Sequence, residues 1–474
     1  MSARTNIAVV GGGVSGLAAA FTLLRSEADD LTVAVFEAEE ALGGKSMTVQ
    51  REGFVIEAGP QGYLDTQPAL TELVNALGLS EQVALSRPES QRRYFYRDGG
   101  FTRVTPNPVQ LLRSGLLSAG EIARAATEPL RRRAPEDASV HQFVAHRFGN
   151  AVADKLIAPA LLGVFAGDVR QLSAAFALPL MTELERTYGS VLIGAVRAAR
   201  ARKREERDVP ERLRPKRSLV SFRDGLGSLV TALEERLQND SPAALRPATG
   251  VHSVRQTTGG YELVIEGGSE TFDGVLLATE THRAAALLEI SSPPASAALE
   301  SIPVPPVTVV AMAFEDAESL QLPPGLGVLV PRGQGIRTLG TLWEHQVFDG
   351  RAPEGAGLVR SLLGGTVDPA IGDLSRAEVE DLALREFRQM TGSGAEPLFI
   401  ETFPWPRAIP QYDLDYPALR ERIAKEVDSL HRLELAGNSL QGPGFSRAAS
   451  RGCDAARSLL KALATSTCEG ASAA

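Results

Sequence analysis

Three glycines near the N-terminus have a spacing that suits phosphate binding. Gly11, Gly13 and Gly16 follow the order Gly-x-Gly-x-x-Gly, directly after the apolar run 6–10. Glycine at these positions permits a tight turn, a close approach of a pyrophosphate to the backbone, and close packing of a helix on a strand. The apolar residues 17–24 predict that helix, and the free N–H groups at its start attract phosphate. The predicted pyrophosphate contacts are Gly11, Gly13, Val14, Ser15 and Gly16.

An acidic residue follows at the distance that a ribose requires. The apolar run 31–36 predicts a second strand, and Glu37 stands at its end. A carboxylate about 20 residues beyond such a turn binds ribose hydroxyl groups. A glycine triplet alone occurs in many ordinary loops. A strand, turn, helix, strand and acid in this order predict a bound dinucleotide.

Further glycines indicate FAD instead of NAD. The pair Gly43 and Gly44 would by itself suit an ordinary turn. At the far end of the chain, however, residues 433–438 predict a strand that runs into a glycine-rich turn and then an apolar helix at 455–460. The start of such a helix attracts an anionic group, such as the edge of a flavin ring. The predicted FAD contacts besides the pyrophosphate turn are Glu37, Ala38, Gly43, Gly44, Lys45, Gly59, Pro60, Gln61, Gly437, Asn438, Gly444, Phe445 and Ser446.

The composition is that of an ordinary globular protein with several domains. At 474 residues the chain is too long for one core and predicts two or three domains. A net charge of −9 argues against general nucleic-acid binding. Only Cys453 and Cys468 are present, which suits a reducing cytosol, and the histidines show no metal-ligand spacing. We expect no signal peptide before the first strand, and no apolar run approaches the ~18 residues that span a bilayer.

The pattern of apolar residues changes twice along the chain. Residues 108–207 have apolar positions at helical spacing, with Ser118 and the segment 137–139 as predicted N-caps. Residues 305–400 alternate strand-like runs and loops, followed by a predicted helix at 377–390. These changes predict an α/β fold with a Rossmann-like FAD-binding domain, an α+β substrate domain and a helical domain. The predicted boundaries are 1–92, 213–300 and 401–474 for the first, 93–107 and 301–400 for the second, and 108–212 for the third.

Basic residues are dense between 197 and 217, where they alternate with acidic ones. This pattern is typical of a solvated helix end followed by a surface linker. It would also suit a patch that faces anionic lipid headgroups.

Motifs spread along nearly the whole chain carry further information. They lie at 91–94, 163–168, 171–173, 186–191, 221–225, 327–331, 338–342, 364–365, 404–405, 409–412 and 436–438. In these motifs the chain resembles the oxygen-dependent protoporphyrinogen oxidases, and the plant-type members most closely. The resemblance implies an FAD domain of the amine-oxidase type, a substrate domain, and a helical domain that docks on a membrane. It also implies a cytoplasmic protein held at the inner face of the cell membrane, and it leaves a homodimer open.

The activity that this resemblance implies is the FAD- and O₂-dependent oxidation of protoporphyrinogen IX to protoporphyrin IX in haem synthesis. Six electrons leave the porphyrinogen in three hydride transfers to flavin N5, and O₂ takes them up as H₂O₂. Because the cofactor carries this chemistry, no side chain is needed as a catalyst. This agrees with a sequence in which no Ser/His/Asp or Cys/His constellation is identifiable.

Five positions match the family's substrate contacts. Arg93 matches an arginine that pairs with a propionate, and a guanidinium suits such bidentate recognition. Leu329 and Leu342 match an apolar pair on one side of the macrocycle, and Gly163 matches a backbone contact. Leu362 stands where many plant-type members have phenylalanine, so that shape is kept while ring stacking is lost.

The resemblance also bears on the cofactor side. It adds Val251 and Trp405 to the predicted FAD contacts. Two positions depart from the family pattern: Ala41 replaces the arginine before Leu-Gly-Gly, and Lys45 replaces the arginine of Gly-Gly-Arg.

Three alternative functions stay open. A coproporphyrinogen III oxidase of the same fold would act on four carboxylates instead of two, and the arginines at 131–133 and 197–217 do not decide between the two substrates. An amine oxidase or carotenoid desaturase is a more distant alternative, since the aromatic cage and lysine–water pair of amine oxidases are not identifiable. A prenyl-protein chaperone of the same fold would hold no flavin, and the intact glycines and Glu37 argue against it.

Overall fold

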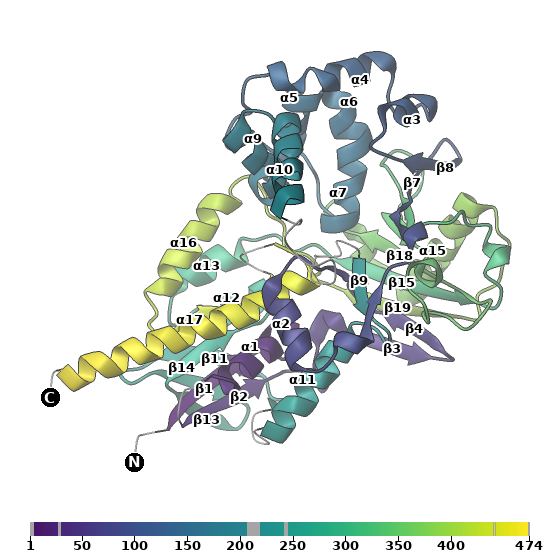
Figure 1. Cartoon of the computed structure of the whole chain (residues 1–474). Coiled ribbons are helices and arrows are strands. Elements are labelled where there is room, and N and C mark those ends of the chain that lie inside the picture. Colours follow the sequence, from purple (N-terminus) through teal and green to yellow (C-terminus); the bar gives the residue numbers. More distant parts are fainter. Residues whose placement is uncertain are drawn as a thin grey trace.

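Two large sheets and a helical region dominate the protein (Figure 1). The computed structural model describes residues 4–26, 30–205, 219–240, 245–438, 440 and 442–472. The helical region lies above the two sheets in Figure 1.

A five-stranded parallel sheet forms the core of the dinucleotide-binding unit. Its order is β10 (Leu245–Arg246), β2 (Leu31–Phe36), β1 (Thr5–Val10), β14 (Gly274–Leu277) and β20 (Leu433–Leu435), with every neighbouring pair parallel. The strands are short apolar runs, as parallel strands buried on both faces require. They come from three distant parts of the chain, which explains why the sequence pattern of this unit breaks off and resumes.

One face of this sheet packs on α1 (Val14–Leu24), α11 (Gly227–Asp240) and α17 (Phe445–Ser472). The helices α1 and α17 approach closely at Gly452, where an added Cβ would lie 2.0 Å from the carbonyl oxygen of Ser15. Cys453 is buried at the same crossing, so it packs as a small apolar group in the last helix.

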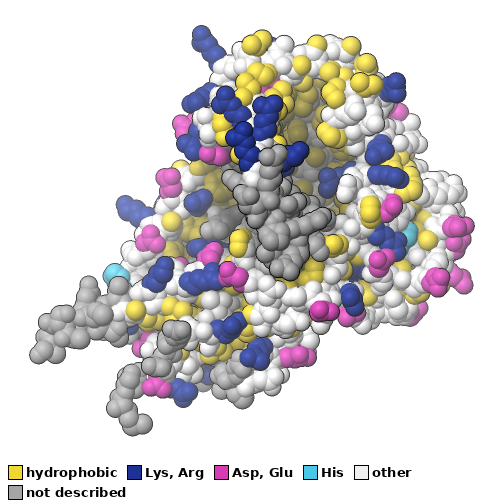
Figure 2. Space-filling view, in the orientation of Figure 1, with side chains coloured by type: hydrophobic (Ala, Val, Ile, Leu, Met, Phe, Trp, Pro, Cys, Tyr) yellow, Lys and Arg dark blue, Asp and Glu magenta, His cyan; other side chains and the backbone are white. Residues whose placement is uncertain are grey.

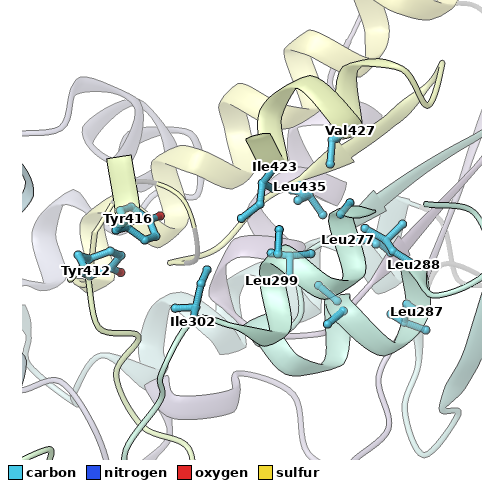
Figure 3. Packing of buried hydrophobic residues seen from close by; sticks show 14 of the residues in the cluster. Leu277, Leu287, Leu288, Leu299, Ile302, Tyr412, Tyr416, Ile423, Val427 and Leu435 are labelled. Atoms are coloured by element: carbon cyan, nitrogen blue, oxygen red, sulfur yellow. The ribbon is translucent and has the colours of Figure 1, made fainter. Parts of the chain in front are cut away.

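The other face of the sheet packs on α12 (Thr281–Leu288), α13 (Pro293–Glu300) and α16 (Tyr416–Asp428). Figure 3 shows Leu277 of β14 beside apolar side chains from these helices. A three-stranded antiparallel sheet packs on the same face beside them, where Phe272 contacts Phe36 of β2 with ring centroids 5.8 Å apart; its strands are β11 (Val251–Gln256), β12 (Tyr261–Ile265) and β13 (Gly268–Phe272).

A second large sheet has seven strands and is mostly antiparallel; only β16 and β7 pair in parallel. The helix α15 (Arg376–Thr391) covers one of its faces, where Phe387 and Met390 join its apolar core. The hairpin of β3 (Thr48–Arg51) and β4 (Phe54–Glu57) packs on the other face. In spatial order the strands are β19 (Phe399–Trp405), β15 (Val307–Phe314), β18 (Gly357–Gly364), β17 (Gly340–Leu342), β16 (Gly327–Leu329), β7 (Arg93–Arg97) and β8 (Gly100–Val104).

The helical region lies between β8 and the segment that returns to the FAD-binding unit. Ser118 and Ser139 form capping boxes with Glu121 and Gln142, which confirms both predicted N-caps. Among the described residues, no helix has both the length and the apolar character that crossing a membrane requires. The helices of the helical region are α3 (Pro108–Arg113), α4 (Ala119–Ala126), α5 (Val140–Phe148), α6 (Asn150–Val152), α7 (Ala158–Phe165), α8 (Ala174–Ala177), α9 (Pro179–Tyr188) and α10 (Val191–Glu205).

Some elements differ from those expected. The predicted boundary between residues 400 and 401 divides β19, which belongs wholly to the seven-stranded sheet because it pairs with β15 along its length. The C-terminal helix begins at Phe445, ten residues before the apolar run that predicted it. Of the basic segment 197–217, the part up to Glu205 continues α10, and residues 206–217 lie outside the described chain.

Candidate functional site

The glycine turn contains two glycines that close packing requires, Gly11 and Gly16, and one that leaves room for a ligand, Gly13. Gly11 has φ +109°, and an added Cβ would lie 2.8 Å from the carbonyl oxygen of Ala278. At Gly16 an added Cβ would lie 1.9 Å from the carbonyl oxygen of Gly11, so only glycine lets α1 pack on the turn. Around Gly13, in contrast, a Cβ would meet nothing within 4 Å. The open side at Gly13 is where a pyrophosphate would approach, and no side chain caps the start of α1.

The predicted ribose carboxylate lies at the same turn. Glu37 follows β2, and its carboxylate accepts hydrogen bonds from the backbone N–H of Gly12 at 2.7 Å and of Glu39 at 3.0 Å. Ala38 lies beside Gly250, at 3.7 Å from the Cβ position there, and Val251 begins the next strand. These predicted contacts therefore surround one end of the glycine turn.

Two further loops pack against the turn from the other side. The N–H of Gly43 donates to the carbonyl oxygen of Gly12 at 2.9 Å, and an added Cβ on Gly44 would lie 3.7 Å from Cα of Gly13. An added Cβ on Gly59 would lie 2.1 Å from the carbonyl oxygen of Lys45. The two predicted cofactor segments, 43–45 and 59–61, therefore touch through their backbones.

The side chain of Lys45 is held beside this contact. Its ammonium pairs with the carboxylate of Glu280 and lies 5.7 Å from the ring centroid of Trp405. Burial lowers the pKa of Lys45 from 10.5 to about 8. The imidazole of His282 lies 3.7 Å from the same glutamate, and burial together with Arg407 and other charges lowers its pKa.

The start of α17 completes the site from the C-terminal end of the chain. The N–H of Gly437 donates to the hydroxyl of Ser15 at 3.0 Å, which joins the C-terminal turn to the start of α1. The ring of Phe445 stacks on Tyr63, with centroids 5.6 Å apart. The helices α1 and α17 cross where Gly452 lies against Ser15. The helix α17 begins about two turns before this crossing in the sequence, and α1 begins less than one turn before it. The two helix starts therefore point at different parts of one extended ligand.

Unpaired polar atoms support a bound polar group in this place. The hydroxyl of Thr279, the amide nitrogen of Gln61 and the amide oxygen of Asn438 are all buried, and none has a hydrogen-bond partner among the described residues. Buried polar groups are almost always paired, so these three indicate a missing partner. Together with the open side of Gly13 and the two helix starts, they fit FAD.

Thr279, Glu280 and Tyr63 are site residues that the sequence predictions missed. Thr279 and Glu280 follow β14 as Glu37 follows β2. The rule that ligands lie at the carboxyl ends of parallel strands would have found both of them. Tyr63 carries no such signal, because its place depends on its contact with Phe445.

The predicted substrate residues share one face of the seven-stranded sheet. Paired residues in neighbouring strands lie on the same face, as do residues two apart in one strand. Arg93 pairs with Gly327, and Gly327 pairs with Leu342. By the same rule, Leu329 pairs with Gly340, and Gly340 with Leu362. All of these residues therefore face the same side as Trp405, which pairs with Val307 at the far end of the sheet.

The helix α7 covers this face. An added Cβ on Gly163 would lie 2.4 Å from Cδ2 of Leu329, so the backbone of α7 lies directly on that leucine. Leu162 and Leu339 pack with Leu362 in the same apolar cluster. The leucines 329, 342 and 362 are each half-buried. This face supplies apolar shape close to the FAD loops.

Arg93 lies at the open edge of the same face. Its side chain is exposed, and within the described chain it has no hydrogen bond or ion pair. Arg97, two residues on, donates to the carbonyl oxygen of Gly115 and pairs with Asp98. The guanidinium of Arg93 is therefore available for a carboxylate.

Tyr412, which belongs to the motif 409–412, occupies a different place from Trp405. It is fully buried, stacks on Phe176 at 6.0 Å and donates to the carbonyl oxygen of Asn438 at 2.6 Å. Tyr412 thus packs beneath the site and reaches it only through Asn438. Trp405 lies at the site itself, beside Lys45.

Comparison with known proteins assigns the class. The family described as flavin containing amine oxidoreductase matches residues 14–460, and the chain belongs to it. FAD, predicted from the glycine turns, is therefore confirmed as the cofactor.

Curated relatives give a finer picture. The chain is 30% identical to the mitochondrial protoporphyrinogen oxidase of Nicotiana tabacum, over 96% of this chain and 94% of the relative. It is 32% identical to the chloroplastic protoporphyrinogen oxidase 1 of Spinacia oleracea, over 93% and 81%. It is 26% identical to the coproporphyrinogen III oxidase of Staphylococcus aureus, over 97% and 99%. The resemblance to protoporphyrinogen oxidases is thus confirmed at the level of similarity.

Solved structures agree on the fold. A protein from Exiguobacterium sp. 255-15 has a TM-score of 0.83 at 25% identity, with 97% of this chain and 100% of that chain covered. Putrescine oxidase bound to putrescine has a TM-score of 0.67 at 18% identity, with 97% and 99% covered, which supports the shared fold alone. The predicted α/β class with a parallel Rossmann-like sheet is confirmed.

Proposed function

We propose that this protein oxidises protoporphyrinogen IX to protoporphyrin IX with O₂, and forms H₂O₂. The observation that carries the proposal is the shared sheet face of Arg93, Leu329, Leu342 and Leu362, covered by Gly163 and continuous with the FAD loops. The similarity to protoporphyrinogen oxidases over more than nine-tenths of the chain supports it.

The residues of this face bind and orient the macrocycle. Bound FAD supplies the hydride acceptor, as flavins do in related oxidations. Arg93 binds a propionate at the open edge, because a guanidinium matches a carboxylate bidentately. The leucines exclude water and hold the apolar macrocycle, and the missing side chain of Gly163 leaves the space that Leu329 fills.

The helical region is proposed to rest on the membrane surface at the cytoplasmic side. Leu130 is 85% exposed and Leu180 69% exposed, and further apolar side chains of α3, α7 and α10 are exposed as well. Figure 2 shows hydrophobic side chains gathered over this region, next to Lys and Arg side chains. An exposed apolar patch beside basic groups suits anionic lipid. The test is sedimentation with phosphatidylglycerol vesicles, and a Leu130→Asp/Leu180→Asp variant that still binds fully would contradict it.

The main test compares two substrates with the purified protein. Protoporphyrinogen IX and coproporphyrinogen III are each supplied in air, and porphyrin fluorescence and H₂O₂ are measured. The proposal predicts the higher kcat/KM for protoporphyrinogen and three H₂O₂ for each porphyrin, since each H₂O₂ takes up two of the six electrons. A clear preference for coproporphyrinogen would overturn the choice of substrate.

Coproporphyrinogen III is the second candidate substrate. It is favoured by the similarity to the oxidases of Staphylococcus aureus and Bacillus subtilis, at 26% and 25% identity. Arg103 and Arg113 also line a pocket of about 290 Å³ near the edge of the sheet. However, Arg103 pairs with Tyr94 and so points away from the face of Arg93. If the tetracarboxylate were the substrate, the comparison of the two porphyrinogens would show the higher kcat/KM for coproporphyrinogen III.

A further inference from the structure

Three successive carbonyl groups of the loop before Pro60 are held by side chains of the seven-stranded sheet. Arg360 donates through Nη1 to the carbonyl oxygen of Glu57 at 2.9 Å and also to that of Gly59. Trp405 donates through Nε1 to the carbonyl oxygen of Ala58 at 2.8 Å. This loop continues directly into the predicted flavin contacts 59–61. Its position is therefore set by the substrate sheet.

Arg360 is a buried charge on an otherwise apolar part of this sheet. Its side chain is 2% exposed, and Nε donates to the carboxylate of Glu344 at 2.8 Å, which is 3% exposed. Replacing such a buried pair with apolar residues of similar size is often neutral or stabilising. Stability alone therefore gives no reason for an arginine in this place.

The position of Arg360 in the register explains what the arginine does. It pairs across the sheet with Leu342 and precedes Leu362 by two residues on β18. It thus lies on the same face as both leucines, while its guanidinium reaches the loop of Gly59. One side chain joins the predicted substrate surface to the predicted flavin loop.

We propose that Arg360 is a positioning residue that fixes the flavin loop relative to the leucines that hold the substrate. This inference rests on the proposed function. Hydride transfer depends steeply on the distance between the reacting atoms, so a small shift of the loop lowers the rate without removing either binding surface. The guanidinium also lies between Glu344 and the loop, so the positive end of the pair faces the flavin side. Such a charge favours the electron-rich reduced flavin and raises its reduction potential.

The test uses the FAD-loaded protein with Arg360→Met and Arg360→Lys. Flavin reduction is followed in single turnovers without O₂, and the flavin reduction potential is measured against a redox dye. For Arg360→Met we expect a limiting reduction rate lower by about tenfold or more, a lower potential, and little change in the apparent Kd of the substrate. Arg360→Lys should recover part of the rate, because it keeps the charge but loses the paired carbonyl bonds.

Arg351→Lys is the matched control. Arg351 is also fully buried, but its bonds go to the side chains of Ser221 and Glu57 and not to the loop carbonyls. We expect Arg351→Lys to lower the unfolding temperature without changing the reduction rate or the potential. Equal effects of Arg360→Lys and Arg351→Lys on the reduction rate and the potential would show that Arg360 is merely structural and would overturn the proposal.

Two difficulties could arise in this test: a variant that does not fold, and a substrate that is not oxidised. If Arg360→Met does not fold, Arg360→Lys and Trp405→Phe, which removes the bond to Ala58, decide instead; wild-type rates and potentials in both would overturn the proposal. The potential needs no substrate, so it tests Arg360 even if neither porphyrinogen is oxidised. If neither porphyrinogen is oxidised, the proposed function is contradicted. A lower potential in Arg360→Met would then still support the role of Arg360, and an unchanged potential would overturn it.

Discussion

The two sides of the site are built by different means. On the cofactor side, contacts come from backbone: Gly13 leaves open space, loop 43–45 packs against the turn, and Gly59 packs on Lys45 of that loop. On the substrate side, contacts come from side chains that four strands bring to one face. The cofactor side depends on short local segments of backbone, whereas the substrate side depends on the register of strands that are distant in the sequence. Replacements on the two sides should therefore fail differently, by loss of cofactor or by loss of substrate affinity.

The largest effect on activity is expected at Gly16, because a variant that holds little FAD can oxidise little substrate. In Gly16→Ala the new Cβ meets the carbonyl oxygen of Gly11, which cannot move without opening the turn. We expect a loss of about 3 kcal/mol in the free energy of unfolding and little bound FAD. Flavin absorbance per protein and thermal unfolding measure the two effects.

Gly13→Ala is the matched comparison. Its Cβ meets nothing in the protein, so the unfolding temperature without FAD should stay unchanged while the affinity for FAD falls. Normal FAD affinity in Gly13→Ala would contradict the placement of the pyrophosphate.

The next largest effect is expected for Arg93→Ala. Its guanidinium is free within the described chain, so the variant should keep its FAD and raise KM. The loss in kcat/KM should correspond to about 2–5 kcal/mol if the propionate pair is desolvated. Steady-state kinetics with flavin content measure this, and Arg97→Ala, on the same face of the same strand, is the control. Loss of flavin in Arg93→Ala would mean that Arg93 is misplaced.

A smaller effect is expected for Gly163→Ala. The new Cβ meets only the end of the Leu329 side chain, which can turn away into the space for the macrocycle. We expect normal folding and a KM several-fold higher. Gly120→Ala, in α4 of the same helical region, meets nothing within 4 Å and should leave KM unchanged. An unchanged KM in Gly163→Ala would remove α7 from the substrate site.

The smallest effect concerns pH. The pKa of Lys45 is lowered to about 8 in the protein without FAD, so its ammonium loses its proton above that pH. The attraction for the pyrophosphate then weakens, and Kd for FAD should rise a few-fold from about pH 7 to about pH 9. Lys45→Met should lack this rise, and a parallel rise in that variant would assign the pH dependence to other groups, such as His282.

The pKa of Lys45 also determines how the free energy of unfolding changes with pH. The folded protein releases this proton more easily than the unfolded chain, whose lysine keeps its value of 10.5. The unfolded state therefore holds more protons between about pH 8 and 10.5, and the free energy of unfolding rises with pH in that window. Thermal unfolding of the protein without FAD, compared with Lys45→Met, measures this slope.

The cofactor side could be predicted well because its signals are local. Gly11, Gly13, Gly16 and Glu37 stand within one strand–helix–strand unit, so spacing alone located them. The start of α17 was less accessible. Its first two turns mix Phe445, arginines and small residues, and only the later run 455–460 has a clear apolar pattern.

The substrate side could not be derived from spacing. Nothing in the sequence fixes the register that brings Arg93 and Leu362 to one face; the family resemblance supplied these residues, and the strand pairing shows that they share a face. Arg360 was missed because a single arginine within an apolar strand carries no pattern. Its partners Glu344 and Gly59 are 16 and 301 residues away in the sequence.

The most direct test of the two-sided site mixes the purified, FAD-containing protein with protoporphyrinogen IX in the absence of O₂. Bleaching of the flavin absorbance, with porphyrin formed in proportion and the absorbance restored by O₂, is the predicted result. A flavin that stays oxidised with both protoporphyrinogen IX and coproporphyrinogen III would contradict the account.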